Sequence, residues 1–165
     1  MKDGESKYAY KKKSAWDILS KQQITTAFTF AEGYKTFLNT VKTEREAVQV
    51  IAETAKKQKK TIVVNQEKSA AIILKGKKPV RDGLRIVISH IDSPRLDLKQ
   101  VPLYQDSDSH LALFETHYYG GIKKFQWVVI PLALHGVIVK KDGKKITFTL
   151  GEDDLDPVFS VPDLL

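Results

Sequence analysis

The 165-residue sequence contains no cysteine. This absence excludes a disulfide scaffold, a thiol nucleophile, an iron–sulfur cluster and a cysteine-ligated zinc finger, so any metal has to be held by His, Asp or Glu. No apolar run approaches the roughly 18 residues that span a bilayer. Residues 1–13 also lack the apolar centre of a signal peptide. We therefore expect a cytoplasmic protein with no membrane partner.

Signatures of several common enzyme classes are missing as well. The sequence has no Gly-Lys-Thr phosphate loop, no Gly-x-Ser-x-Gly elbow and no His-Glu-x-x-His helix, so P-loop nucleotide hydrolysis and the common serine and zincin proteases lack support. Ser93 lies close to His90 in the sequence. An Asp-Ser-Pro segment after a strand is not the strained strand-to-helix turn that a nucleophilic serine needs, so a serine nucleophile is not favoured.

The charge is positive but unevenly distributed. The chain has 27 Lys and Arg against 20 Asp and Glu, for a net charge of +7, yet residues 100–165 carry 6 basic and 9 acidic side chains. Aromatic residues are not interleaved with the basic ones as they are in a single-strand binder. A basic nucleic-acid binder is therefore the weakest alternative, and we expect no nucleic-acid partner. The lysines form short tracts at residues 11–13, 56–60, 75–78 and 140–145.

The first third of the sequence has helical periodicity. Apolar residues recur at steps of three and four from Ile24 to Val41, which predicts an amphipathic helix, and Ser14 upstream resembles a helix start signal. Thr43 and Glu46 form the sequence pattern of a capping box, in which each side chain accepts from the backbone amide of the other residue. A second helix is therefore expected to begin there.

Beyond residue 60 the periodicity is that of strands. Residues 84–88 are nearly continuous in apolar character, as expected of a strand that is covered on both faces by helices and ends at His90. From about residue 100 only strands are expected, with a hairpin turn at residues 141–144. This change marks a candidate domain boundary near residue 100. The other predicted strands are residues 61–65, 69–75, 111–115, 125–134, 136–140 and 145–150.

The densest polar cluster is residues 90–96, directly after the predicted buried strand, which is where open α/β sheets place their ligands. His90 and Asp92 would point to the same side of an extended segment, so the carboxylate could orient the imidazole or share its metal. A strand-end histidine bonded to its neighbour is the alternative. A metal site needs at least three protein ligands, and we expect the other histidines, His110, His117 and His135, to be structural or solvated.

Three motifs in order, residues 90–97, 117–124 and 156–165, resemble the M18 family of metalloaminopeptidases, the aspartyl aminopeptidase group. The resemblance covers almost the whole chain, including the helix that leads into residues 42–46. It implies an α/β zinc-peptidase catalytic domain with an inserted β-rich dimerisation domain. Residues 1–99 would be the N-terminal part of the catalytic domain, and residues 100–165 the first part of the dimerisation domain.

The resemblance also implies a zinc-dependent aminopeptidase that hydrolyses N-terminal residues from peptides by a metal-activated water. Two zinc ions would occupy each active site, with cobalt or manganese as alternatives. His90 would be a zinc ligand, and Asp92 would be the active-site carboxylate that fixes the tautomer of His90. Family members self-associate into dimers and dodecamers.

Two departures from the family pattern limit these expectations. The connection between the second helix and the first strand, residues 56–60, is shorter than usual in the family. The remaining metal ligands and the glutamate general base of the family have no match in this chain. As given, the chain would therefore be truncated and inactive alone. The alternative function is a non-catalytic assembly or oligomerisation module.

Overall fold

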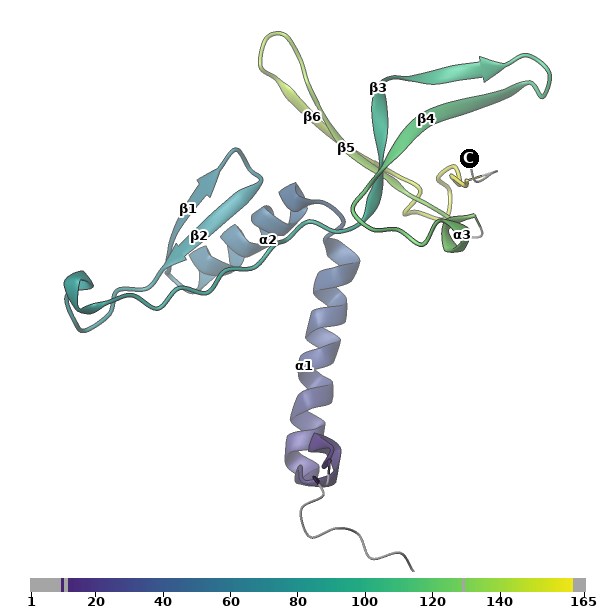
Figure 1. The fold of residues 1–165 in the computed structure, drawn as a ribbon. Helices are drawn as coiled ribbons and strands as arrows, with labels where there is room; N and C mark the ends of the chain where they lie inside the picture. The colour runs from purple at the N-terminus through teal and green to yellow at the C-terminus, as the bar shows by residue number, and fades with distance from the viewer. Residues whose placement is uncertain (1–9, 11, 129, 162–165) are drawn as a thin grey trace, which may run out of the picture. The chain divides into compact units, whose positions relative to one another are not determined.

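A computed structural model describes residues 10, 12–128 and 130–161 (Figure 1). Contacts within the chain divide it into two compact units, residues 1–40 and 41–165, which are described separately. None of the helices in the described part of the chain is both long enough and apolar enough to cross a membrane.

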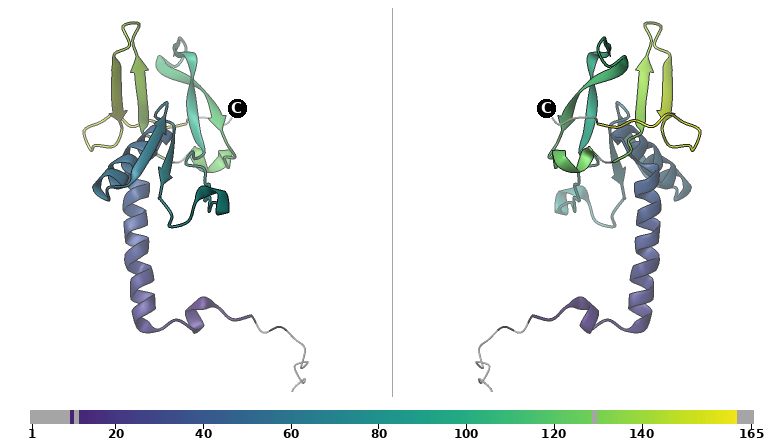
Figure 2. Two further views of the ribbon diagram at one scale, coloured as in Figure 1. Left: turned by 90° about the vertical axis from the view of Figure 1, so that its left-hand side faces the viewer. Right: turned by 90° about the vertical axis from the view of Figure 1, so that its right-hand side faces the viewer.

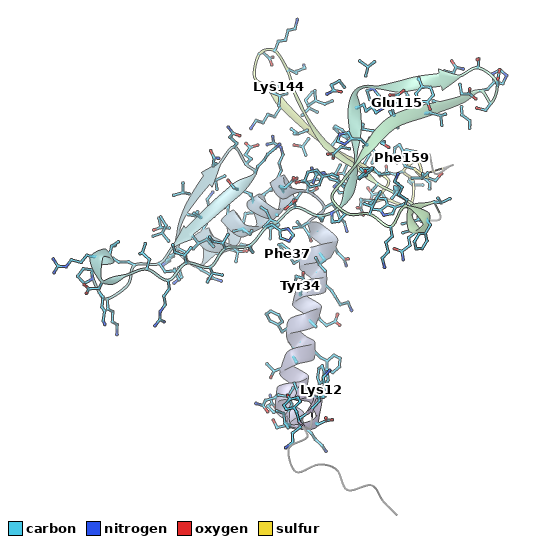
Figure 3. All side chains as sticks on the ribbon, in the orientation of Figure 1. Lys12, Tyr34, Phe37, Glu115, Lys144 and Phe159 are labelled. Carbon is cyan, nitrogen blue, oxygen red and sulfur yellow. The ribbon has the colours of Figure 1, made fainter. Side chains whose placement is uncertain are left out.

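The first unit contains the 3-10 turn η1 (Ala15–Asp17) and the helix α1 (Lys21–Thr40). Ser14 caps η1, because its hydroxyl accepts from the amide of Trp16 at 3.3 Å. A separate pair of bonds between Ser20 and Gln23 starts α1. The predicted helix is therefore confirmed, although Ser14 starts η1 rather than α1. None of its residues is buried, and the stacked rings of Tyr34 and Phe37 lie 6.3 Å apart (Figure 3).

The second unit begins with the helix α2 (Glu44–Lys57), and the predicted capping box is present. Glu46 Oε2 accepts from the amide of Thr43 at 2.8 Å, and Thr43 Oγ1 accepts from the amide of Glu46 at 3.4 Å. The helix packs on the antiparallel strands β1 (Thr61–Asn65) and β2 (Ser69–Ile73), both of which were predicted. The buried apolar residues among those described all lie on α2: Ala47, Val48 and Ala55.

The prediction of a buried strand at residues 84–88 is wrong. These residues follow the 3-10 turn η2 (Val80–Asp82) and belong to no helix or strand. The same is true of residues 89–94. Val87 is 97% exposed and Ile88 is 88% exposed. An apolar run becomes an inner strand only when strands flank it and helices cover it, and none of the described strands pairs with this segment.

The long hairpin β3 (Arg95–Asp106) and β4 (Leu111–Tyr119) follows. The strand β3 was not predicted from the sequence, and only the first half of β4, residues 111–115, was. The antiparallel pairing runs from Arg95 opposite Tyr119 to Asp106 opposite Leu111, with a register break between Leu98 and Leu103, where the hairpin bends in Figure 1. The candidate domain boundary near residue 100 falls at this break and stays a prediction.

The last elements are the short helix α3 (Lys124–Trp127) and the hairpin β5 (Leu134–Val139) and β6 (Lys145–Leu150). The predicted hairpin turn is confirmed, with Gly143 at a φ of 82°. The predicted strand at residues 125–134 is wrong, because α3 occupies its start and Pro131 lacks the amide that a strand ladder needs. Only an isolated bridge from Leu132 to Phe159 forms there.

The described strands therefore form three separate two-stranded sheets, which Figure 2 shows from two sides. Side chains connect these sheets to one another and to the segment after β6. Glu67, in the turn between β1 and β2, contacts Arg45 of α2 at 2.7 Å and Lys145 of β6 at 2.5 Å. Phe114 of β4 lies with its ring 6.3 Å from that of Phe159 (labelled in Figure 3).

Candidate functional site

His90 and Asp92 lie together, as the sequence predicted for an extended segment. The Oδ1 atom of Asp92 is 3.1 Å from Nδ1 of His90, and the backbone carbonyl oxygen of Asp92 is also 3.1 Å from that nitrogen. The His90 side chain is 85% exposed, whereas that of Asp92 is 33% exposed. The imidazole is thus anchored on one side and open on the other.

This geometry selects one tautomer of His90. Both oxygens facing Nδ1 are acceptors, so the proton belongs on Nδ1, and the Nε2 lone pair remains for a ligand. Within the described residues no hydrogen bond engages Nε2. A histidine whose second nitrogen donates to a carboxylate is the usual arrangement of a metal ligand.

The other carboxylate oxygen of Asp92 is held from β4. The hydroxyl of Tyr119 donates to Oδ2 at 2.8 Å. This bond is the main cause of the lowered pKa of Asp92, and the backbone amide of Asp92 and the side chain of His90 contribute less. The same bond raises the pKa of Tyr119. Asp92 is therefore a charged acceptor at neutral pH, and Tyr119 a neutral donor.

Arg95 supports the ring of Tyr119. Its guanidinium carbon lies 4.0 Å from the ring centroid, and the two residues are cross-strand partners in β3 and β4. Arg95 Nε donates to Asp97 at 2.7 Å, and its terminal nitrogen lies 3.1 Å from Glu44 at the start of α2. Three elements, α2, β3 and β4, thus converge behind the pair of His90 and Asp92.

The donor set present fits part of a zinc site. An imidazole nitrogen backed by a carboxylate is a normal zinc ligand. Among the residues that the structure describes, however, no three His, Asp or Glu side chains are grouped so that they could hold a metal ion. His90 can therefore contribute one ligand, with Asp92 behind it, and further ligands would have to come from elsewhere.

The remaining histidines lie apart from this pair. His135, on β5, is 12% exposed and has both nitrogens against carboxylates, Nδ1 at 2.7 Å from Glu46 and Nε2 at 3.0 Å from Glu152. This arrangement connects α2 to β5 and to the segment after β6. His110 occupies the β3–β4 turn with a positive φ of 58°, and His117 lies opposite Asp97 in the hairpin.

Sequence reasoning missed the roles of Tyr119 and Arg95. Both belong to motifs that were recognised, residues 117–124 and 90–97, but without β3 their pairing could not be derived. The available signal was the alternation of Arg95, Asp97 and Lys99 with leucine and glutamine, a pattern typical of a strand with one polar face.

Comparison with known proteins agrees with this partial site. Residues 37–165 match the model of the family described as aminopeptidase I zinc metalloprotease (M18). The chain is 47% identical over 171 residues to the probable M18 family aminopeptidase 1 of Clostridium acetobutylicum, covering 93% of this chain and 36% of that protein. It is 31% identical over 103 residues to the aspartyl aminopeptidase of Caenorhabditis elegans, covering 62% of this chain and 21% of that one.

Solved structures give the same result. Aminopeptidase I from Borrelia burgdorferi is similar with a TM-score of 0.84 at 36% identity, covering 92% of this chain and 41% of that chain. The M18 aminopeptidase from Thermotoga maritima is similar with a TM-score of 0.82 at 37% identity, covering 95% of this chain and 37% of that chain. The chain therefore has a metallopeptidase fold and belongs to the M18 family of aminopeptidases. It spans about a third of the length of the curated relatives it matches.

Proposed function

We propose that this chain is the N-terminal part of a zinc-dependent aminopeptidase that removes N-terminal residues from peptides. The observation that carries the proposal is the match of residues 37–165 to a family of zinc metalloproteases. Because the chain spans only 36% of the length of the Clostridium acetobutylicum relative, the activity of the whole protein is itself proposed here. The geometry of His90 and Asp92 adds independent support, because it is that of a metal-ligating histidine.

In this proposal His90 holds zinc through Nε2, and Asp92 keeps the imidazole proton on Nδ1. Zinc, when bound, polarises the scissile carbonyl and lowers the pKa of water to about 7. Two zinc ions serve each active site, and nitrogen and oxygen ligands would also accept cobalt or manganese. The glutamate that serves as general base in the family has no match in this sequence, so in this proposal the general base comes from another part of the whole protein.

We assign residues 1–99 to the catalytic domain and residues 100–165 to an inserted β-rich dimerisation domain. The bond from Tyr119 to Asp92 joins the two segments at the candidate site. The β3–β4 hairpin also exposes several large apolar side chains, including Val101 at 85%, Leu103 at 60% and Leu111 at 52%. Exposed apolar residues of this kind favour self-association through this segment. We propose dimers and then dodecamers for the whole protein because the family forms them.

A zinc titration of this chain, compared with a protein extended beyond Leu165, tests the proposal. The extended protein is expected to bind two zinc ions per chain and to release N-terminal residues from peptides, whereas this chain alone does neither. Tight stoichiometric zinc binding by this chain alone would show that it already holds a complete set of zinc ligands, and would overturn this part of the proposal.

Light scattering on the same samples separates the proposal from the alternative of a non-catalytic assembly module. Specific oligomers that hydrolyse peptides support the proposed enzyme. Specific oligomers that carry no zinc and no peptidase activity in the extended protein would favour the assembly module instead.

A further inference from the structure

The hydroxyl of Tyr119 reaches the candidate site from the last residue of β4, at the open end of the β3–β4 hairpin, and no sequence motif assigns it a role there. We propose that Tyr119 is a positioning residue for the zinc ligand His90: it acts through Asp92, and Arg95 holds its ring in place. This inference rests on the proposed function, since it concerns how the same site is kept ready for metal.

The side chain of Asp92 is oriented by its hydrogen-bond partners. Its two carboxylate oxygens have different partners, Nδ1 of His90 on Oδ1 and the hydroxyl of Tyr119 on Oδ2. The torsion that orients a carboxylate is broad and has no strong intrinsic preference. The orientation of Asp92 is therefore set by its two partners, and loss of the Tyr119 hydroxyl would leave Oδ2 to solvent.

The ring of Tyr119 is held in place by Arg95. Arg95 lies across the hairpin with its guanidinium 4.0 Å from the ring centroid, a cation–π contact. Arg95 is itself only 25% exposed and is fixed by Asp97 at 2.7 Å and by Glu44 at 3.1 Å. A guanidinium bound in its own plane cannot easily swing away from the ring, so the ring is held by a chain of contacts that ends on α2.

The backbone after β4 and the segment that carries Asp92 approach each other closely. Gly120, directly after Tyr119, has a φ of 72°, and a Cβ there would lie 3.6 Å from Cα of Pro94. The positive φ lets β4 turn away at once after Tyr119. The segment that carries Asp92 therefore passes directly beside the end of β4, and a phenol hydroxyl spans the remaining gap.

The neighbouring tyrosine provides a matched control. Successive residues of a strand point to opposite faces, and Tyr118 has its ring against Lys124, with the ammonium nitrogen 5.1 Å from the centroid. Tyr118→Phe and Tyr119→Phe remove the same atom from adjacent positions of β4. Only the second change removes a bond to Asp92.

The test has a metal-free readout. In this chain, 15N NMR of the His90 imidazole reports whether the proton resides on Nδ1. We expect Tyr119→Phe to move the population away from that tautomer, while Tyr118→Phe leaves it unchanged. An unchanged tautomer in Tyr119→Phe overturns the inference. Should Tyr119→Phe fail to fold, Arg95→Lys is the second variant: it keeps the hydroxyl but loses the flat guanidinium, and we expect a smaller shift in the same direction.

Zinc affinity of the extended protein, measured by competition with a chelator, provides the second readout. Tyr119→Phe is expected to weaken zinc binding about 10-fold, the lower end of what partners behind a ligand contribute. In an Asp92→Asn background the same change is expected to add almost nothing, because Tyr119 acts through Asp92. Additive losses would show that Tyr119 acts independently of Asp92 and would overturn the inference.

The two readouts also separate this inference from the proposed function. An extended wild-type protein that binds no zinc refutes the proposed aminopeptidase, even where the tautomer shift in Tyr119→Phe is as expected. Normal zinc binding with no effect of Tyr119→Phe on tautomer or affinity refutes the positioning role alone.

Discussion

Glu46 connects the start of α2 to β5, and its replacement by alanine tests whether this connection holds the second unit together. Its Oε2 atom accepts from the amides of Lys42 and Thr43, both at 2.8 Å, and its Oε1 atom lies 2.7 Å from Nδ1 of His135. The side chains of Glu46 and His135 are 27% and 12% exposed. Glu46→Ala therefore removes the Glu46 half of the capping box, although Thr43 still caps the helix, together with a half-buried charged contact.

The expected loss follows from these two parts. Loss of the capping bonds that Glu46 accepts from the amides at the helix start costs about 1 kcal/mol, and a hydrogen bond to a charged group contributes about 1.5–3 kcal/mol, of which we take the lower end because of the exposure. Glu46→Ala is therefore expected to lower the free energy of unfolding by about 2.5 kcal/mol.

Urea unfolding followed by circular dichroism measures this loss as a lower midpoint at an unchanged slope. Glu53→Ala is the matched control, since Glu53 lies on the same helix and accepts a hydrogen bond from the side chain of Gln49 at 3.2 Å. That control is expected to stay within about 0.5 kcal/mol of the wild type. If the two variants lost equally little stability, the connection between α2 and β5 would have no energetic role.

Two further predictions concern acid sensitivity and packing. Burial raises the pKa of Glu46, but the bonds from His135, Lys42 and Thr43 outweigh it and lower the pKa overall. The stability that this group contributes is therefore present above the ordinary glutamate pKa of 4.5 and is lost as the pH falls through the lowered pKa. In urea melts over a pH series, Glu46→Gln should reduce the loss of stability at acid pH. An unchanged acid loss in this variant would show that Glu46 is not its cause. A Cβ at Gly136 would overlap the ring of Phe148, so Gly136→Val is expected to lower the free energy of unfolding by about 1–3 kcal/mol. Gly143→Asn, in an open turn, should lower it clearly less in the same melts. Equal losses would show that the contact with Phe148 is not the cause.

Local signals in the sequence were sufficient where a structure depends on neighbouring residues. The capping box at Thr43 and Glu46 needs only four residues, and the strands β1 and β6 have the predicted bounds. The turn at Gly143 follows from the glycine that tolerates its φ of 82°. Each of these features is complete within a short stretch of chain.

Features that depend on distant partners were not predicted. Residues 84–88 have the composition of an inner strand, but burial needs flanking strands and covering helices, and Val87 is 97% exposed without them. At the site, the proximity of His90 and Asp92 follows from their spacing, whereas the bond from Tyr119 joins residues that are 27 positions apart. That contact depends on the register of β3 and β4, which the sequence alone does not define.

The most direct test of the central claim is the zinc content of the extended protein with His90 and with alanine in its place. We expect the wild-type protein to retain zinc through gel filtration. We expect His90→Ala to weaken zinc binding by more than about 100-fold, beyond what changes behind a ligand produce, with an unchanged circular dichroism spectrum. An unchanged zinc content in the folded His90→Ala variant would contradict the assignment of His90 as a metal ligand.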